Sequence, residues 1–514
     1  MEEKYLLGID AGTSNVKAVL FGIDGEEKFI SSRKNKIIRK HRTWTEQDMN
    51  LLWADLCDAI KEIIENNNID SDSILGIGIT GQGEGCWLID AQGNPVRNAI
   101  LWSDGRASNI AEEIKKDKKQ SDKIKEITGS YPFQGATSII LKWLKENEPD
   151  DLRKAAYCFF CKDWLKYKLT GNISLEITDA STSILDLESK KNSSELMKIL
   201  DIKEYEYLFA DIIKPYELSG TISKDIAKLT GLSEGTPVAA GMMDVVASAV
   251  GMGAVKEGDS CTILGTTCCN EVVKSSYKNN TDNAFGFECH AVDNLYLNVI
   301  ASMAGTPNLD WIINNFFIEE KKLAEEKNKN LYRILEEKIK DIPVGAGGVI
   351  YHPYISTGGE RAPFSNPNAR AQFFGISANS EKYHLLKAVY EGIALSIKDC
   401  LQGMNNSGKI YLGGGGAKSF YWAQIISDCT GKEVIISKGN EFAARGAALA
   451  AGVEIGIYKD IVNASLNTLK VKKCFIPEEK NNKKYEKIYK LYKELREVEN
   501  NLWNVRKEIF HSEY

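Results

Sequence analysis

Short apolar runs separated by glycine turns open the chain. Residues 5–10 read YLLGID, Gly12 begins a tight turn, and residues 18–22 form a second apolar run that ends before Asp24-Gly25. Two strands joined directly by a glycine turn favour a β-hairpin over the strand–helix crossover of a dinucleotide-binding fold. The apolar periodicity of residues 51–65 then predicts a helix.

A second unit of the same design lies far downstream. Residues 260–264 form an apolar run, residues 265–267 (GTT) form a turn, and residues 271–274 form another apolar run. This repetition indicates two related halves. At 514 residues the chain is also too long for one hydrophobic core. We therefore predict two domains, residues 1–250 and 251–514, and a ligand site between them.

Helical patterns account for much of the remaining sequence. Residues 105–235 are rich in charge and helix formers and contain amphipathic stretches at 138–144 and 163–169, which predicts an elaboration of the first half. Apolar residues at helical spacing over 385–400 follow a polar start at Asn379-Ser380 and predict a long buried helix.

One apolar stripe predicts a closing helix near the end of the sequence. The heptads are too few for a coiled coil, so we expect this helix to pack on the second half. The stripe consists of Tyr485, Ile488, Tyr492, Leu495, Val498 and Leu502.

Composition and charge narrow the class of protein. With 43% apolar and 26% charged residues the chain reads as soluble and globular, and no apolar run approaches the ~18 residues typical of a membrane span. No secretory signal is visible at the start, so a cytoplasmic protein is expected. A net charge of −6, with lysines at 115–125 and 479–493 interleaved with acids, argues against nucleic acid as a partner.

The eleven cysteines are scattered along the chain. Cys158 with Cys161 and Cys268 with Cys269 lack the second pair that a structural zinc site needs. Most cysteines are therefore expected to be buried thiols in a reducing compartment.

The segment GIDAGTSNVKAVLF carries the first candidate site. Asp10 ends a strand, and Gly12, Thr13 and Ser14 form a turn that can present N–H groups and hydroxyls to an anion. A carboxylate beside a phosphate cradle makes sense mainly if Mg²⁺ sits between them. An ordinary hairpin turn is the alternative interpretation.

Two further glycine turns can bring the backbone close to a nucleotide, because glycine has no Cβ to block the approach. They are LGTT at 264–267 and GGGG at 413–416, where the second follows a short apolar strand and precedes a helix. Each is a weak signal alone, and the glycine run could be only a flexible turn.

Asp244 lies at the glycine-flanked start of a small-residue helix in GMMDVVASAVGMG. The N–H groups of a helix N-terminus would hold its carboxylate ionised. A plain N-terminal capping aspartate is the alternative, and local spacing by itself favours it.

Polar and aromatic residues follow the third apolar strand. Gln82 and Glu84 lie among glycines, and Trp102, Asp104 and Arg106 come about twenty residues later. An indole face beside amides and acids suits a polyhydroxylated ligand. Equally, Asp104 and Arg106 could form a structural ion pair, with Trp102 in the core.

Taken in order, these segments resemble the FGGY family of carbohydrate kinases, and the match covers nearly the whole chain. The order of the motifs makes the resemblance specific. The motifs are GIDAGTSNVKAVLF, WTEQD at 44–48, LTGNISLEITDAS at 169–181, GMMD at 241–244, LGTT at 264–267, GERAPFSNPNARAQFFGI at 359–376, YEGIAL at 390–395 and GGGAKSFYWAQIISDCTG at 414–431.

The resemblance implies an α/β fold of two actin-like (ribonuclease H-like) ATPase domains that close over a central cleft. It implies ATP-dependent phosphorylation of a hydroxyl of a small sugar or polyol, with ATP and Mg²⁺ (magnesium) as cofactors. Members of the family are often oligomers, so a homodimer is also expected.

The resemblance also implies roles for individual residues. Asp244 would be the general base, and Asp10 and Asp244 would hold the metal, directly or through water. The implied ATP-binding residues are Gly12, Thr13, Ser14, Lys17, Gly265, Thr266, Thr267, Gly305, Asn308, Gly414, Gly415 and Ala417. The implied substrate-binding residues are Gln82, Gly83, Glu84, Trp102, Asp104 and Asp244.

The residues after GITGQ bear on the choice of substrate. Gly83-Glu84 departs from the Arg-Glu of glycerol kinases and the Met-His of D-xylulose kinases, and is similar to the L-xylulose and erythritol kinase branches. Gly83 is expected to leave room for a larger acceptor, and Glu84 to accept two hydroxyl hydrogen bonds. A pentulose such as L-xylulose is expected, with erythritol, D-xylulose or glycerol as alternatives.

Two other features complete the resemblance. Cys268-Cys269 departs from the small residues usual after the phosphate turn, and burial is the expected role. A sugar sensor or chaperone-like ATPase on the same scaffold is the alternative from another class. A sensor could lack the base, so Asp244 favours the enzyme.

Overall fold

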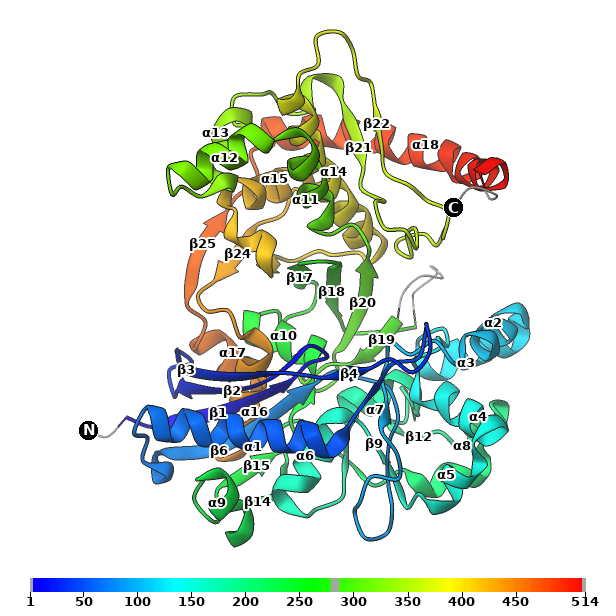
Figure 1. Cartoon of the computed structure of the whole chain (residues 1–514), viewed down its shortest axis with the longest axis vertical. Coiled ribbons are helices and arrows are strands. Elements are labelled where there is room, and N and C mark those ends of the chain that lie inside the picture. The colour runs from blue at the N-terminus through cyan, green and yellow to red at the C-terminus, as the bar shows by residue number, and fades with distance from the viewer. Residues whose placement is uncertain (1–2, 279–285, 511–514) are drawn as a thin grey trace.

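Two lobes stacked one above the other make up the molecule (Figure 1). The structure is a computed structural model, and it describes residues 3–278 and 286–510. Each lobe is built on a seven-stranded sheet. The lower sheet contains β1 (Tyr5–Ala11), β2 (Asn15–Gly22), β3 (Glu27–Lys34), β6 (Ile74–Gly81), β14 (Leu218–Thr221), β15 (Pro237–Ala239) and β16 (Met242–Met243). The upper sheet contains β17 (Ser260–Leu264), β18 (Cys268–Lys274), β19 (Gly286–Cys289), β20 (Tyr296–Ser302), β23 (Ile410–Gly413), β24 (Val434–Ser437) and β25 (Val471–Phe475).

The two sheets share one topology. In the lower sheet β1 pairs antiparallel with β2 and parallel with β6. In the upper sheet β17 pairs antiparallel with β18 and parallel with β23. Each hairpin therefore occupies the same place relative to the parallel strand that follows it. The predicted hairpin and the two related halves are confirmed.

Two helices lie between the sheets and join the lobes. They are α10 (Asp244–Met252) and α16 (Phe442–Glu454). A core between the lobes combines Val19 of β2, Val246 of α10, Tyr411 of β23 and Leu449 of α16. Because α10 follows a strand of the lower sheet and α16 a strand of the upper one, each half of the chain contributes one helix to this layer.

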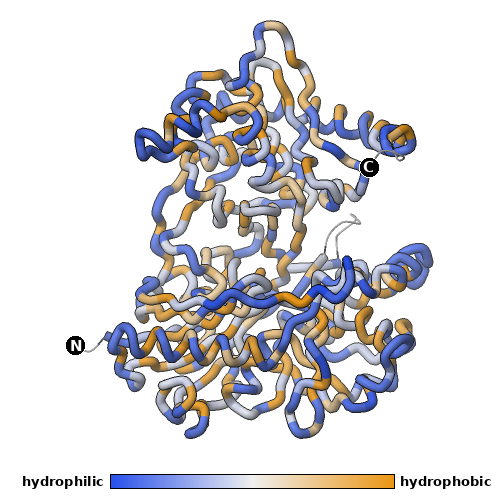
Figure 2. The backbone as a smooth tube through the Cα atoms, in the orientation of Figure 1, coloured by the Kyte–Doolittle hydropathy of each residue, from blue (hydrophilic) through white to orange (hydrophobic). Residues whose placement is uncertain are grey.

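The remaining helices cover the outside of the lobes. The peripheral helices α2, α3, α12 and α13 are mostly hydrophilic (Figure 2), as expected for solvated faces. The lower lobe carries α1 (Met49–Asn66), α2 (Ser108–Lys116), α3 (Lys118–Thr128), α4 (Thr137–Asn147), α5 (Pro149–Lys154), α6 (Cys161–Thr170), α7 (Ile177–Ser183), α8 (Ser194–Ile199) and α9 (Lys224–Thr230). The upper lobe carries α11 (Pro307–Phe316), α12 (Ile318–Glu326), α13 (Leu331–Ile339), α14 (Lys382–Gly403), α15 (Phe420–Thr430), α17 (Ile461–Asn467) and α18 (Glu479–Phe510).

The closing helix α18 packs along only part of its predicted stripe. Tyr485 and Tyr492 are buried on the upper lobe, as expected. Val498 and Leu502 are 67% and 56% exposed, so the prediction is wrong for the end of the stripe. Trp503 takes over the packing there, because a straight helix with 3.6 residues per turn drifts away from a seven-residue repeat.

Most of the cysteines are buried, as expected. Nine of the eleven cysteines are buried, whereas Cys269 is half-buried and Cys474 is exposed. Within residues 3–278 and 286–510, no helix combines the length and apolar character that a bilayer crossing requires.

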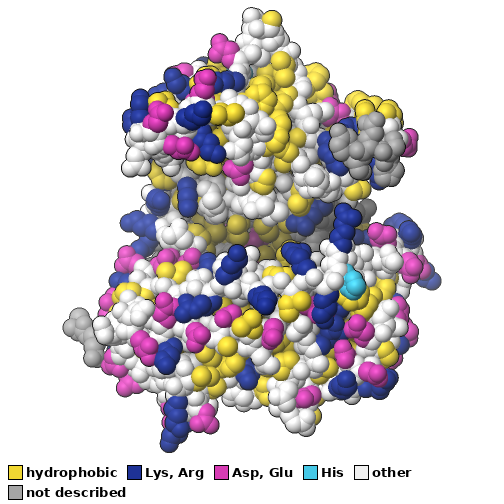
Figure 3. Space-filling model, viewed as in Figure 1, with side chains coloured by type: hydrophobic (Ala, Val, Ile, Leu, Met, Phe, Trp, Pro, Cys, Tyr) yellow, Lys and Arg dark blue, Asp and Glu magenta, His cyan; other side chains and the backbone are white. Residues whose placement is uncertain are grey.

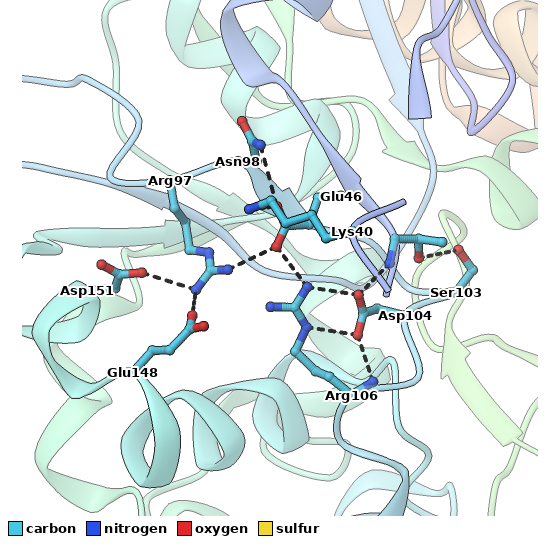
Figure 4. Close-up of polar contacts among 10 residues, drawn as sticks. Lys40, Glu46, Arg97, Asn98, Ser103, Asp104, Arg106, Glu148 and Asp151 are labelled. Carbon is cyan, nitrogen blue, oxygen red and sulfur yellow. Dashed lines mark hydrogen bonds and ion pairs between the residues drawn. The ribbon is translucent and has the colours of Figure 1, made fainter. Parts of the chain in front are cut away.

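A buried ion network holds the early motif WTEQD against the loop that follows β8 (Ala99–Ile100) (Figure 4). Arg106 lies 2.9 Å from both Glu46 and Asp104, measured between guanidinium nitrogens and carboxylate oxygens, and all three side chains are buried. Arg97 adds a second cation 3.0 Å from Glu46. The guanidinium of Arg106 also stacks 4.2 Å above the ring of Trp44.

The pKa of Glu46 shows how well this network is paired. Burial would raise it, but hydrogen bonds from Lys40 and Arg106, with the charge of Arg97, lower the pKa to about 2. The stabilisation is therefore present above the usual pKa of 4.5 and is lost as the pH falls toward 2.

We expect Gly78→Ala to destabilise the protein. A Cβ at Gly78 would lie 1.8 Å from the carbonyl oxygen of Ala447 in α16, so the helix has to move away from β6. Overpacking of this kind costs about 1–3 kcal/mol. Thermal unfolding of the purified variant measures the effect.

Gly76→Ala is the matched control on the same strand. Its added Cβ would meet Ile455 at 3.4 Å, an ordinary contact. Equal melting temperatures for the two variants would contradict the close approach of α16 to the sheet.

We expect Arg106→Gln to lower the free energy of unfolding by about 3–5 kcal/mol, because it removes the guanidinium that the buried carboxylates of Glu46 and Asp104 share. Lys118→Gln is the control, since Lys118 and its partner Asp122 are exposed and such a pair is worth about 1 kcal/mol or less. Urea denaturation at pH 7 measures both. A loss for Arg106→Gln no larger than for Lys118→Gln would show that the network contributes little.

Candidate active site

Three parallel strands of the lower sheet end side by side. Across β6, Thr80 is flanked by Asp10 of β1 and by Met242 of β16. Asp244 follows directly after β16, so Asp10 and Asp244 lie on either side of the end of β6. Figure 3 shows a hollow between the two lobes. Ligands of such sheets bind at the carboxyl ends of the strands.

Burial raises the pKa of both aspartates. Burial, and then the negative charge of Asp10, raise the pKa of Asp244 to about 7. Burial raises the pKa of Asp10 to about 6, although the charge of Lys17 opposes the change. Desolvation and a second carboxylate thus oppose the backbone N–H groups at the helix start, which favour the ionised form of Asp244.

Asp244 is the first residue of α10 and not its N-cap. Met243 holds the N-cap position, and the carboxylate of Asp244 accepts a hydrogen bond from the N–H of Val245 at 2.9 Å. No side chain caps this helix. The capping interpretation that the sequence favoured is thus not what the structure shows.

The first glycine turn holds a chain of side-chain hydrogen bonds. The indole N–H of Trp102 donates to the hydroxyl of Thr13 at 3.0 Å, and this hydroxyl donates to the amide oxygen of Gln82 at 3.1 Å. Gln82 in turn donates to Gln47 at 2.9 Å. Trp102 is 38% exposed, so it is not a core residue. Phosphate and sugar candidates from distant segments therefore meet here.

Asn35 braces the same turn and was not found from the sequence. Its side-chain amide donates to the carbonyl of Gly12 at 2.7 Å, and its backbone N–H donates to the carbonyl of Ser14 at 2.9 Å. A single asparagine in a charged strand segment carries no signal of such a role.

Lys17 connects the lobes. Its ammonium lies 2.6 Å from the carboxylate of Glu441, the residue that precedes α16. In this geometry Lys17 is paired with a carboxylate, so its ATP-binding role stays a prediction that requires this pair to open or shift.

Glu84 is held by residues that the sequence did not single out. Its carboxylate accepts hydrogen bonds from the backbone N–H of Thr137 at 3.0 Å and from the hydroxyl of Ser183 at 2.7 Å. Its φ of 58° is left-handed. One carboxylate oxygen is therefore already engaged, which leaves less of Glu84 for a sugar than expected.

Gly83 does not leave the expected room. A Cβ at this position would lie 2.1 Å from the sulfur of Met243, so that side chain fills the space. The expectation of a larger acceptor pocket at Gly83 is wrong, because a residue 160 positions away in the sequence packs there.

Asp104 and Arg106 form the structural ion pair that was one of the two alternatives (Figure 4). The carboxylate of Asp104 accepts from the N–H of Thr45 at 2.6 Å and from the N–H of Arg106 at 2.8 Å, in addition to the guanidinium. With Asp104 fully buried, this geometry favours a structural role over contact with a sugar.

The second glycine turn meets two other segments. The N–H of Thr306 donates to the carbonyl of Gly265 at 2.8 Å, and a Cβ at Gly305 would lie 2.2 Å from the carbonyl oxygen of Thr266. A Cβ at Gly414 would lie 2.6 Å from the carbonyl oxygen of Leu264. The three nucleotide-binding candidates thus lie together.

Exposure differs among the candidates on this nucleotide side. Thr266, Gly414 and Gly415 are exposed, Gly265 and Thr267 are half-buried, and Ala417 is buried. Asn308 is fully buried, where it donates to the carbonyl of Gly305 at 3.0 Å and accepts from Tyr351 at 2.8 Å. Asn308 therefore holds the backbone at Gly305 from a buried position.

Three further buried carboxylates, which the sequence did not single out, lie near Asp244 or Gly83. Glu271 of β18 and Glu288 of β19 are buried, and the charge of Asp244 contributes to raising the pKa of each, after burial. Asp179 of α7 is also buried and lies beside Gly83. Glu271 and Glu288 lie on strands, where an acid resembles an ordinary surface residue, so no sequence pattern marks them. Asp179 lies within the motif at 169–181, which by itself does not single it out.

The donor set fits Mg²⁺. This ion keeps several waters and binds through one or two carboxylates together with substrate phosphates. Asp10 and Asp244 supply two such carboxylates beside the first glycine turn. Over the described ranges, no three His, Cys, Asp or Glu side chains gather closely enough to hold a metal by themselves, so the cage of protein ligands typical of zinc is not found there.

Comparisons with known proteins agree with this geometry. A xylulose kinase of Bacillus subtilis (strain 168) is 29% identical over 506 residues, which cover 96% of each chain. A probable L-xylulose kinase of Haemophilus influenzae is 29% identical and covers 97% of this chain and 99% of its own. The crystal structure of a gluconate kinase from Lactobacillus acidophilus superposes with a TM-score of 0.88 at 23% identity, over 98% of this chain and 99% of that one.

The family profiles cover most of the sequence. The N-terminal domain of the FGGY family of carbohydrate kinases matches residues 5–251, and its C-terminal domain matches residues 261–455. The two related sheets, the central helices and the motif order agree with this assignment. The chain is therefore a sugar kinase that belongs to the FGGY family and has its two-domain actin-like (ribonuclease H-like) ATPase fold.

Proposed function

We propose that this kinase transfers the γ-phosphoryl group of ATP to a hydroxyl of a pentulose such as L-xylulose, and that Asp244 is the general base. The observation that carries the proposal is the position of Asp244. It lies between the two sheets, beside Asp10, with a pKa raised to about 7. A base whose pKa lies near the working pH is the most effective in proton transfer.

The protein's part in the reaction is mainly positioning. The carboxylate of Asp244 would accept the proton of the attacking hydroxyl. The backbone N–H groups of residues 12–14 and 265–267 would donate to the phosphates from the two lobes. Asp10 and Asp244 would hold Mg²⁺, which when bound neutralises phosphate charge. Closure of the lobes would exclude water as a competing acceptor.

Trp102 and Gln82 support a sugar on the lower-lobe side of this site. The half-exposed indole offers an apolar face for the C–H surface of a sugar ring or chain. Gln82 and Glu84 offer hydrogen-bonding groups for hydroxyls. We leave Asp104 out of the proposed sugar site, because its oxygens are taken up by the ion network.

The choice of a pentulose rests on relatives whose names refer to xylulose and L-xylulose. Erythritol, D-xylulose and glycerol stay as alternatives, and the space at Gly83 no longer argues for a larger acceptor. The domain boundary near residue 250 and a homodimer also stay predictions.

The test of the function is ADP release from ATP with a panel of L-xylulose, D-xylulose, ribulose, erythritol, xylitol and glycerol. We expect one neutral acceptor to stimulate ADP release far above the rate without acceptor. Asp244→Asn should lower kcat by about 10²–10⁴-fold, because a positioned base contributes that much, while ATP binding measured by calorimetry is retained.

Asp225→Asn is the matched control, since Asp225 is exposed on α9. No stimulation by any member of the panel would argue against the proposed function. Near-normal activity of folded Asp244→Asn would remove Asp244 as the base and leave the kinase assignment in place.

The pH profile should report the raised pKa of Asp244. Only the ionised carboxylate can accept a proton, so kcat/KM for the acceptor is expected to rise about tenfold from pH 6 to pH 8 and then level off. Steady-state assays with saturating Mg²⁺ and ATP measure this. A profile that is already flat at pH 5 would mean that Asp244 titrates near its usual value and that the site is more hydrated than described.

A further inference from the structure

The upper sheet presents two glutamates on the face that looks toward α10. In the antiparallel register, Glu271 of β18 pairs with Val299 of β20, and Glu288 of β19 pairs with Leu297 of β20. Residues paired in this way lie on the same face of a sheet. Val299 and Leu297 pack into the core between the lobes, so both glutamates also point to that side.

Neither glutamate is fully paired. Glu271 is 0% exposed and Glu288 is 5% exposed, yet the Oε2 atom of each has no hydrogen-bond partner. The hydrogen-bond partners of Glu271 are two thiols, those of Cys269, at 3.5 Å, and Cys261. Each of these oxygens is therefore available to accept a hydrogen bond from a hydroxyl group of a ligand.

The lower lobe brings more carboxylates to the same region. The N–H of Cys289, next to Glu288, donates to the hydroxyl of Ser181 in α7 at 2.8 Å, which docks β19 on that helix. Asp179 of the same helix is buried, its Oδ1 lacks a hydrogen-bond partner, and it lies 3.2 Å from where a Cβ on Gly83 would be.

Burial raises the pKa of Glu271 to about 8 and that of Glu288 well above its usual value. The charges of Glu271, Asp244, Asp179 and Glu84 contribute to the rise for Glu288, so acids of both lobes lie close enough to oppose one another's ionisation. This region therefore already disfavours a further negative charge, whether on a side chain or on a ligand.

Lys162 contacts Asp179, and it is already paired with two other carboxylates. The ammonium of Lys162 lies 2.7 Å from Asp179, 3.3 Å from Glu176 and 3.2 Å from Asp163, and all four side chains are fully buried. Lys162 is therefore not available to pair with an anionic ligand.

We propose that Glu271 and Glu288 form the upper wall of the acceptor site and restrict the acceptor to uncharged polyhydroxy compounds, with sugar acids and sugar phosphates excluded. This inference rests on the proposed function and specifies its substrate class. Hydroxyl groups would satisfy the unpaired oxygens. An acceptor carboxylate would add a further negative charge to a site that holds Asp10, Asp244 and the phosphates of ATP, and juxtaposed like charges oppose binding.

A matched pair of ligands tests the proposal. Xylitol and D-xylonate differ only in that a carboxylate replaces one hydroxymethyl group. Their inhibition constants are measured against the best neutral acceptor of the panel, and D-gluconate is assayed as an acceptor itself. We expect xylonate to bind at least about 100-fold more weakly than xylitol, and gluconate to give no ADP release.

Glu271→Gln and Glu288→Gln, singly and together, test the two residues. Each removes a potential negative charge and keeps the size of the side chain. The ratio of the two inhibition constants, xylonate over xylitol, should fall below about tenfold in the double variant. It should fall by a smaller factor in each single variant. Glu326→Gln, on the exposed surface of α12, is the control and should leave this ratio of inhibition constants unchanged.

The outcomes separate this inference from the proposed function. If wild-type protein binds xylonate as well as xylitol, or phosphorylates gluconate as efficiently as a neutral sugar, the inference fails while the kinase assignment stands. If the ratio of inhibition constants is unchanged in folded Gln variants, Glu271 and Glu288 do not cause the discrimination between xylitol and xylonate. If no neutral acceptor supports ADP release, the proposed function fails and the inference fails with it. If a variant does not fold, the comparison of xylitol with xylonate on the wild-type protein still tests the inference.

Discussion

The close packing of α10 against α16 between the two sheets is the constraint on which the rest of the structure depends. A Cβ at Gly251 would lie 2.0 Å from the carbonyl oxygen of Phe442, and one at Gly446 would lie 2.0 Å from that of Ala247. Only glycine allows the helix backbones to approach this closely. Since α10 begins at Asp244, the same packing sets the position of the proposed base relative to both glycine turns.

Buried acids have two different fates in this molecule. Around Glu46, two arginines and a lysine compensate the burial, and the pKa of Glu46 is lowered to about 2. Around Asp244, the neighbours are other carboxylates, and burial raises the pKa values of Asp10 and Glu271 as well. Arginines thus surround the buried acid in the ion network, whereas the acids near the proposed substrate have mainly other acids as charged neighbours.

Both lobes supply groups to the proposed reaction, so their relative position matters. The lower lobe contributes Asp10, Asp244 and the first glycine turn, and the upper lobe contributes the second turn and Glu271. Lys17 and Glu441 form an ion pair from one half of the chain to the other at 2.6 Å. We therefore expect that a binding site divided in this way is completed when the lobes close.

Local sequence determined the elements and the family. The β-hairpin, the repeated half, the buried helix α14 and the glycine turns follow from apolar periodicity and from glycine positions, which depend on neighbours close in the chain. The ordered motifs also located Asp10, Thr13, Gln82 and Asp244 in one site. These features were within reach because periodicity and turn chemistry are short-range properties.

The tertiary structure alone decided the chemistry of the site. The raised pKa of Asp244, the side chain of Met243 in the space beside Gly83, the anchoring of Glu84 by Ser183, and the unpaired oxygens of Glu271 and Glu288 all depend on residues far apart in the sequence. Desolvation and packing sum over such distant neighbours, and a linear pattern does not record which residues will meet. The sequence by itself therefore determined which kind of protein this is, and the fold decided how its acids are charged and what they face.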